Sequence, residues 1–275
     1  MTLAIGMICQ GGLVFAADTR VVFADDSVSD MQKLLSFRAN AGMFAIAQSA
    51  EDANAADSLI RNLEYTFRDQ DPETCTFAIL EAAIETQLQS WYVPVYDNRP
   101  RVQLLIGICL NGNEDRRIYF CEPPNTVTRV LGGYQAIGDG WLVSDPIYNH
   151  WFKQEMPSSP HACLCQISYL MYKAKQVKPT AVGGHTDAVL ITGESGDFDF
   201  PYYIERVSMA VAESHGMALD RHLNKLAGLV MAGSLEGQKD ILQAAESIYS
   251  SSMSYAALEF RCQFPEKTIR RKFCT

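Results

Sequence analysis

Apolar side chains fill both alternating sets of positions at the start of the chain. Residues 2–9 read as a strand that is apolar on both faces, as expected when both faces are covered. The glycines in 10–12 favour a hairpin turn, because glycine readily adopts a positive φ. A second apolar strand over 13–17 ends abruptly at the charged residue Asp18. The pattern predicts a buried β-hairpin with a charged end.

Shorter apolar runs then alternate with segments that have apolar residues at helical spacing. The acidic segment 21–30 is expected to be a loop. Further extended segments are expected at 34–37, 43–48, 101–110, 116–121, 127–137 and 188–192. Helices are expected at 52–67, 74–91, 141–152, 161–175, 207–231 and 235–257. This mixture predicts an α+β fold in which strands are flanked by layers of helices.

The sequence contains no recognisable linker between domains. No segment rich in proline, glycine or serine divides the 275 residues, so a single domain over 1–275 is the simplest prediction. The helices expected after about residue 207, and a basic tail, extend this domain at its C-terminal end.

Composition narrows the function classes. The net charge of −9 argues against a nucleic-acid partner, because such proteins present a basic surface. Most of the eight cysteines lie in apolar runs and are expected to be reduced. Cys163-Leu-Cys165 lacks zinc-ligand spacing, so no metal is expected. The N-terminus lacks the positive start of a signal peptide, and no apolar run reaches membrane-spanning length. A cytoplasmic protein without a membrane partner is predicted.

Thr2 is the first candidate for chemistry. Removal of Met1 would leave Thr2 with a free α-amine beside its own hydroxyl. A threonine hydroxyl is a poor nucleophile unless a base takes its proton, and this amine can be that base. The reference pKa of an α-amine is about 7.7–8.0, so most of it is protonated at neutral pH. A neighbouring positive charge would lower that pKa.

A lysine held by a carboxylate would supply such a charge, and Lys33 and Asp18 are the candidates. In an antiparallel hairpin the end of the second strand lies near the start of the first, which favours a position for Asp18 beside Thr2. Sequence spacing alone does not bring Lys33 to the same place. Taken singly, Lys33 could be a surface lysine and Asp18 a strand-end residue.

The order of these residues resembles a known family. The motifs are Thr2 at the chain start, Gly11-Gly12-Leu13-Val14, Ala16-Ala17-Asp18-Thr19-Arg20 and Met31-Gln32-Lys33-Leu34. Together they look like the opening of proteasome β-type subunits, and the single residue before the threonine is closest to the bacterial proteasome-like homologues. Segments 47–52, 136–140 and 182–184 extend the resemblance more thinly towards Thr192.

The resemblance implies the N-terminal-nucleophile hydrolase fold, a four-layer αββα sandwich of two antiparallel sheets. It also implies hydrolysis of peptide bonds through an acyl-enzyme, with Thr2 as nucleophile, Lys33 tuning its amine and Asp18 fixing Lys33. Substrates would be peptides or unfolded proteins, no cofactor is implied, and the family assembles into rings with the sites inside a chamber.

Three further positions complete the site that the resemblance implies. Arg20 would brace it, and the backbone N–H of Gln48 would form the oxyanion hole. Asp139 stands where the family has a serine that positions the amine, although a turn residue there is an equal alternative.

Departures from the family's pattern keep a second function open. Pro179 and Val182 replace polar residues that lie near the amine in the family. The alternative to an active threonine peptidase is therefore a ring-forming structural or regulatory homologue with weak or no catalysis. A third reading is a non-peptide amide substrate for the same nucleophile. The mass of the mature protein and the turnover of fluorogenic peptides separate these readings.

Overall fold

The computed structural model describes most of the chain. The described residues are 2–22, 27–92, 100–113, 115–124, 126–153, 156–193 and 202–231. Residues Met1–Gly216 form one compact unit and Met217–Thr275 a second. The expected helix at 235–257 and the basic tail lie outside the described residues.

The first antiparallel sheet is built around the predicted N-terminal hairpin. Its strands are β1 (Ala4–Cys9), β2 (Gly12–Asp18), β10 (Tyr134–Ile137), β11 (Thr186–Gly193) and β12 (Tyr202–Val207). They lie in the order β10-β1-β2-β11-β12. In the hairpin Ala4 pairs with Ala17, and the turn residue Gly11 has φ +87°. The sequence therefore located this hairpin correctly.

The second antiparallel sheet follows chain order, β5-β6-β7-β8-β9. Its strands are β5 (Leu34–Ala39), β6 (Gly42–Ala50), β7 (Val102–Leu110), β8 (Arg116–Glu122) and β9 (Thr126–Arg129). Consecutive antiparallel strands need only short connections, except between β6 and β7, where two helices intervene. A two-stranded ribbon of β3 (Arg20–Val22) and β4 (Val28–Asp30) stands apart from both sheets.

Helices cover the outer face of each sheet. They are α1 (Ala53–Arg68), α2 (Phe77–Tyr92), α3 (Trp141–Trp151) and α4 (Pro160–Val177). A fifth helix, α5 (Met209–Met231), follows β12 in the chain. The N-cap Asp52 accepts hydrogen bonds from two backbone N–H groups of the first turn of α1. The buried side chains of α1 recur every three or four residues, at Ala56, Leu59, Ile60, Leu63 and Phe67. This stripe explains why the helix was predictable.

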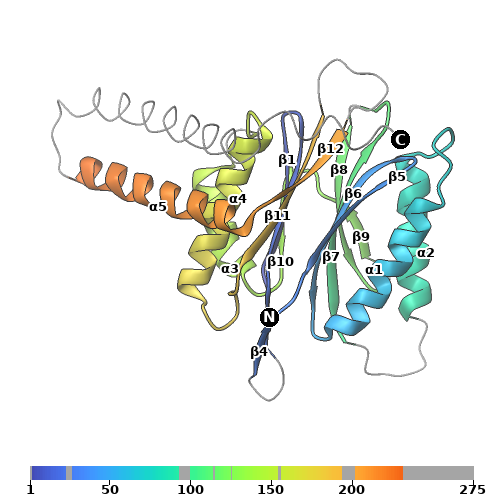
Figure 1. Cartoon of the computed structure of the whole chain (residues 1–275), viewed down its shortest axis with the longest axis horizontal. Coiled ribbons are helices and arrows are strands. Elements are labelled where there is room, and N and C mark those ends of the chain that lie inside the picture. Colours follow the sequence, from blue (N-terminus) through green and yellow to red (C-terminus); the bar gives the residue numbers. More distant parts are fainter. Residues whose placement is uncertain are drawn as a thin grey trace. The chain divides into compact units, whose positions relative to one another are not determined.

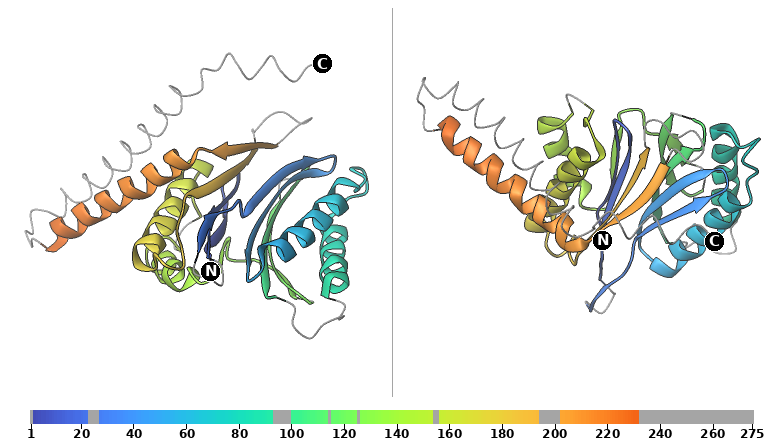
Figure 2. Two further views of the ribbon diagram at one scale, coloured as in Figure 1. Left: turned by 60° about the horizontal axis from the view of Figure 1, so that its bottom comes forward. Right: turned by 45° about the horizontal axis from the view of Figure 1, so that its top comes forward.

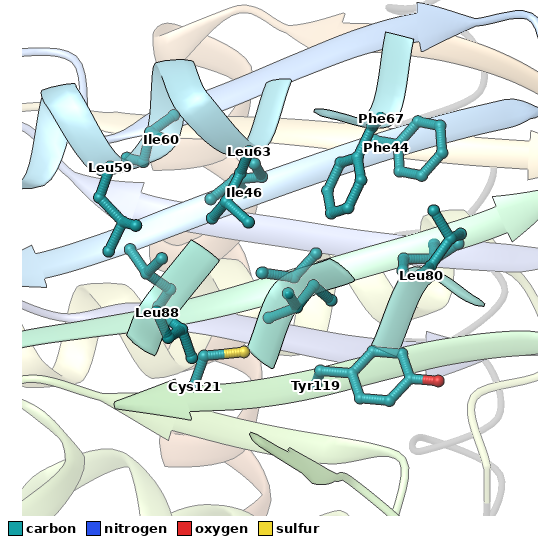
Figure 3. Packing of buried hydrophobic residues seen from close by; sticks show 14 of the residues in the cluster. Phe44, Ile46, Leu59, Ile60, Leu63, Phe67, Leu80, Leu88, Tyr119 and Cys121 are labelled. Carbon is teal, nitrogen blue, oxygen red and sulfur yellow. The ribbon is translucent and has the colours of Figure 1, made fainter. Parts of the chain in front are cut away.

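Three hydrophobic clusters hold residues 1–216 together. One packs α1 and α2 on the second sheet, and it includes the stacked rings of Phe44 and Phe67, 4.8 Å apart (Figure 3). Another packs α3 and α4 on the first sheet. The third lies between the two sheets, around Phe15. Figures 1 and 2 show the helix pairs on opposite outer sides of the two sheets.

The prediction of a mixed α+β fold with antiparallel sheets is confirmed. Two elements differ from expectation. The segment 21–30 contains the ends of the β3–β4 ribbon, and the helix expected from residue 207 is preceded by β12, which pairs with β11. None of the described helices is both long enough and apolar enough to cross a membrane.

Candidate active site

The β1–β2 hairpin places Asp18 beside the start of β1. The carboxylate of Asp18 is completely buried, and its Oδ1 accepts a 3.0 Å hydrogen bond from the backbone N–H of Leu3. In return, the N–H of Asp18 donates to the carbonyl oxygen of Leu3 at 3.0 Å. A buried carboxylate costs several kcal/mol unless donors surround it, so these contacts fix Asp18 next to Thr2.

Lys33 joins this pair from the start of the second sheet. Its Nζ lies 2.6 Å from Oγ1 of Thr2 and 3.1 Å from Oδ1 of Asp18, and it also donates to the carbonyl of Arg20. Thr2 and Lys33 are only 3% and 6% exposed. The structure thus brings together the three residues that the sequence singled out.

Burial and a neighbouring carboxylate act on the pKa of Lys33 in opposite directions. Desolvation lowers the pKa of its ammonium below the ordinary 10.5, and the adjacent Asp18 carboxylate opposes this shift. The charged form has three donors for three acceptors, namely Thr2, Asp18 and the carbonyl of Arg20. The neutral form has two donors and a lone pair that can accept the Thr2 hydroxyl proton. Both forms therefore fit the same heavy-atom positions.

A loop after α4 closes the site from the other side. The N–H of Gly183 donates to Oδ2 of Asp18 at 3.1 Å, and the guanidinium of Arg20 donates to the carbonyl of Pro179. Next to it, Oγ1 of Thr19 donates to Asp30 at 2.7 Å and accepts from the N–H of His185 at 2.8 Å. Arg20 therefore contacts this loop through a backbone carbonyl, and its bracing role in the site stays a prediction.

The turn 138–140 packs on the backbone of Thr2. The N–H of Gly140 donates to the carbonyl oxygen of Thr2 at 3.1 Å. Gly138 has φ +77°, and a Cβ there would lie 2.3 Å from the same oxygen, so only glycine fits. The side chain of Asp139 is exposed, while its carbonyl accepts from Lys178 at 3.4 Å. Its role near the amine of Thr2 stays a prediction.

Gln48 lies at the site, but its backbone N–H is already engaged. That N–H donates to the carbonyl of Lys33 at 3.0 Å. An oxyanion hole at this amide would require that bond to be shared or exchanged, so the assignment also stays a prediction.

Two adjoining hollows surround these residues. A cleft of about 50 Å³ is lined by Thr2, Arg20, Lys33, Gln48 and neighbours from β3, β6 and α1. A larger groove of about 420 Å³ runs between β5 and α1 and shares Met31, Lys33 and Gln48 with the cleft. In the described part of the chain, no three His, Cys, Asp or Glu side chains gather as a metal site would need.

Sequence reasoning missed the main-chain partners of the site. The N–H of Gly183 and the carbonyls of Arg20 and Pro179 are backbone groups, which leave no mark in residue type. The one available signal was Gly183-Gly184, where a glycine pair marked a special turn. The Thr19–Asp30 contact was also missed, because the ribbon that carries Asp30 was expected to be a loop.

Comparison with known proteins supports the fold alone. No protein-family model and no curated protein sequence matches the chain. An Anbu mutant from Hyphomicrobium sp. strain MC1 has a TM-score of 0.66 at 15% identity, covering 83% of this chain and 97% of that one. Anbu (ancestral beta-subunit) from Yersinia bercovieri has a TM-score of 0.65 at 14% identity, covering 82% of this chain and 97% of that one.

A third similar structure is a helical assembly of the Anbu complex from Pseudomonas aeruginosa, with a TM-score of 0.64 at 15% identity, covering 82% and 95%. Anbu proteins are related to the proteasome but form a distinct family. The assignment to the proteasome β-subunit family was therefore wrong. The motifs that carried this assignment most strongly lie in the first fifty residues. At this identity, the fold of the chain is similar to that of Anbu proteins.

Proposed function

We propose that the chain is a self-associating hydrolase of peptide or other amide bonds whose nucleophile is Thr2. The observation that supports this most directly is the 2.6 Å contact between Nζ of Lys33 and Oγ1 of Thr2. Nζ of Lys33 also lies 3.1 Å from the buried carboxylate of Asp18. A nucleophile, a proton acceptor and a group that orients the acceptor are the three parts such chemistry needs. The four-layer αββα fold of N-terminal-nucleophile hydrolases is the finer fold class that goes with this proposal.

The reaction divides into two steps. Oγ1 of Thr2 attacks the substrate carbonyl carbon, and its proton passes to the α-amine freed by removal of Met1 or to neutral Lys33. The tetrahedral intermediate then expels the amine, which takes up that proton, and leaves an ester on Thr2. Water attacks this ester in the second step, releasing the acid and restoring the hydroxyl. Backbone N–H groups at the cleft would stabilise the negative oxygen of each intermediate.

The choice of proton acceptor is also open to experiment. Nζ of Lys33 lies 2.6 Å from Oγ1 of Thr2, and its lowered pKa makes the neutral form more accessible. The α-amine requires Met1 to be absent. If the intact mass of the purified protein includes Met1 and hydrolysis persists, Lys33 is the acceptor.

A second candidate is a self-associating structural or regulatory protein with weak or no hydrolysis. Pro179 is exposed and Val182 is completely buried, and neither side chain can hold the amine of Thr2. The fold likeness to a helically assembled Anbu complex is compatible with this candidate as well. Self-association of the chain, in rings or in a helix, is therefore common to both candidates.

One experiment separates them. The purified full-length protein is assayed with a panel of fluorogenic peptides, alongside Thr2→Ala and Thr2→Ser. Hydrolysis by the wild type and by Thr2→Ser, with none by Thr2→Ala, supports the hydrolase. Equal residual rates for the wild type and Thr2→Ala would leave the structural candidate. Electron microscopy of the same samples tests the assembly independently of the chemistry.

A further inference from the structure

The side chain of Gln48 presents an unusual buried acceptor. Gln48 is 4% exposed, and among the described residues its Oε1 has no hydrogen-bond partner. Leaving a buried carbonyl oxygen unpaired is unfavourable, because the oxygen has lost water without gaining another donor. Gln48 is also one of three residues that line both the cleft at Thr2 and the groove between β5 and α1. An unpaired acceptor therefore lies in the wall between the proposed nucleophile and a cavity large enough for a side chain.

The direction of Gln48 follows from the register of β6. Phe44 and Ile46, two and four positions earlier, face the α1–α2 cluster, and alternate residues of a strand point to the same side. Gln48 accordingly faces α1, where the groove lies. The torsion that carries a glutamine amide is broad, so Oε1 can turn into the groove with little cost.

The lining of the groove mixes apolar and polar side chains, and its charges are balanced. Leu34, Leu35 and Ile60 supply apolar wall for the methylene groups of a substrate side chain. Two basic and two acidic side chains also line it, and the acids are already paired. Asp57 lies 3.5 Å from Arg61, and Glu64 lies 2.6 Å from Arg68. A charged substrate side chain would therefore find no unpaired counter-ion in this groove among the described residues.

We propose that Gln48 is a substrate-recognition residue and that the groove takes an uncharged side chain ending in an N–H donor, as in glutamine. The donor would hydrogen-bond to Oε1 of Gln48 and relieve its unpaired state. A carboxylate of the same shape has no donor and would meet Oε1 with like partial charge. A lysine side chain would approach the ammonium of Lys33. This inference rests on the proposed function and names the substrate class of the same site.

The test compares three fluorogenic peptides that differ only at the residue before the cleaved bond, which is glutamine, methionine or glutamate. Methionine matches the length of glutamine without its donor. With the wild type, kcat/KM is expected to be about 3- to 10-fold higher for glutamine than for methionine, the effect of one neutral hydrogen bond, and lowest for glutamate. In Gln48→Met the ratio of glutamine to methionine falls to about 1.

A matched control removes another buried oxygen without a partner. Ser168 on α4 is 3% exposed, and within the described structure its Oγ has no partner, but it packs away from the groove. Ser168→Ala should keep the glutamine preference of the wild type. Binding of the same peptides to Thr2→Ala, measured by fluorescence anisotropy, gives a readout that does not depend on catalysis.

The outcomes separate the two proposals. Hydrolysis with equal rates for glutamine and methionine peptides would overturn the role of Gln48 and leave the hydrolase intact. Selective binding to Thr2→Ala without any hydrolysis by the wild type would support the groove and overturn the hydrolase. Neither hydrolysis nor selective binding would overturn both.

Discussion

The backbone N–H of Gly183 donates a 3.1 Å hydrogen bond to Oδ2 of Asp18, a residue 165 positions earlier in the chain. Oδ1 of the same carboxylate accepts from Leu3 and from Lys33. Three distant segments therefore meet at one fully buried carboxylate. Leu3, Lys33 and Gly183 each satisfy part of the hydrogen-bonding capacity of the Asp18 carboxylate. The position of Lys33 beside Thr2 therefore depends on all three of these contacts.

Asp18→Asn should be strongly destabilising. The amide has nearly the same shape, but its NH2 group cannot accept a hydrogen bond, and the buried ammonium of Lys33 loses its counter-ion. Breaking a buried ion pair from one side costs about 3–5 kcal/mol, which urea unfolding would detect as a lower midpoint. Asp139→Asn is the control, because that side chain is exposed and should change stability by less than about 0.5 kcal/mol. Equal midpoints for both variants would contradict the role given to Asp18.

The buried Lys33 should also make stability depend on pH. Its pKa is lowered in the folded protein by desolvation, against 10.5 when the residue is free in water. Between the lowered pKa and 10.5 the unfolded chain binds more protons than the folded one, so the free energy of unfolding rises with pH. This contribution is complete above 10.5 and is lost as the pH falls through the folded pKa.

Comparing the wild type with Lys33→Met isolates that contribution. The difference between their free energies of unfolding, measured by urea titration at several pH values from neutral to 10.5, should move in favour of the wild type as the pH rises. In the hydrolase, kcat/KM should rise over the same window if Lys33 accepts the Thr2 proton, since only the neutral form can do so. A difference in unfolding free energy that is independent of pH would show that the pKa of Lys33 is not lowered.

Short-range sequence patterns predicted the elements that are determined by residues close together in the chain. The β1–β2 hairpin and α1 follow from alternation, turn glycines and helical spacing, and the hairpin register alone predicted that Asp18 lies near Thr2. The strand β12 was missed because its pairing partner β11 defines it more than its own residues do. The three-residue strands of the β3–β4 ribbon are too short to show any period.

The candidate site shows the same division. Its side chains have identities that a sequence reveals, so Thr2, Asp18 and Lys33 could be selected in advance. Its backbone donors and acceptors are the same in every residue type, so the sequence does not distinguish them. The hydrogen bond from Gly183 to Asp18 could be found only in the folded structure. The recognition role proposed for Gln48 likewise depends on the burial of its side chain and on the lack of a hydrogen-bond partner for Oε1 among the described residues. The spacing of residues in the sequence reveals neither property.

Gly184→Ala should disturb the loop that holds Asp18. Gly184 has φ +63°, and a Cβ there would lie 2.2 Å from Oδ1 of Asp30 and 2.4 Å from Oγ1 of Thr19. The backbone strain alone is about 1–2 kcal/mol. Displacing the Thr19–Asp30 hydrogen bond adds about 1 kcal/mol more.

Gly112→Ala separates these two costs. Gly112 has nearly the same φ, +67°, and no atom lies within 4 Å of a Cβ placed there. It should therefore show the strain without the clash. Thermal unfolding should give a clearly larger decrease in Tm for Gly184→Ala than for Gly112→Ala. Similar decreases would mean that the Thr19–Asp30 contact does not constrain the loop.

The last prediction concerns Lys175, which ties the same loop to α5. Its Nζ donates to the carbonyl of Gly184 at 3.0 Å, to Oγ1 of Thr186 at 2.8 Å and to Glu213. Lys175 is 14% exposed, so water screens this ion pair less than a surface pair. A double-mutant cycle with Lys175→Met and Glu213→Gln should give a coupling energy above about 1 kcal/mol.

The ion pair of Arg61 and Asp57 on α1 is the matched comparison. It also joins a basic side chain to a carboxylate, but the two side chains are 72% and 41% exposed. Its coupling should stay near 0.3–0.5 kcal/mol, roughly the value of i,i+4 helix pairs. Because Lys175 also holds the carbonyl of Gly184, Lys175→Met should lower kcat/KM of the proposed hydrolase. If both pairs couple equally weakly, α5 does not stabilise the loop through Glu213.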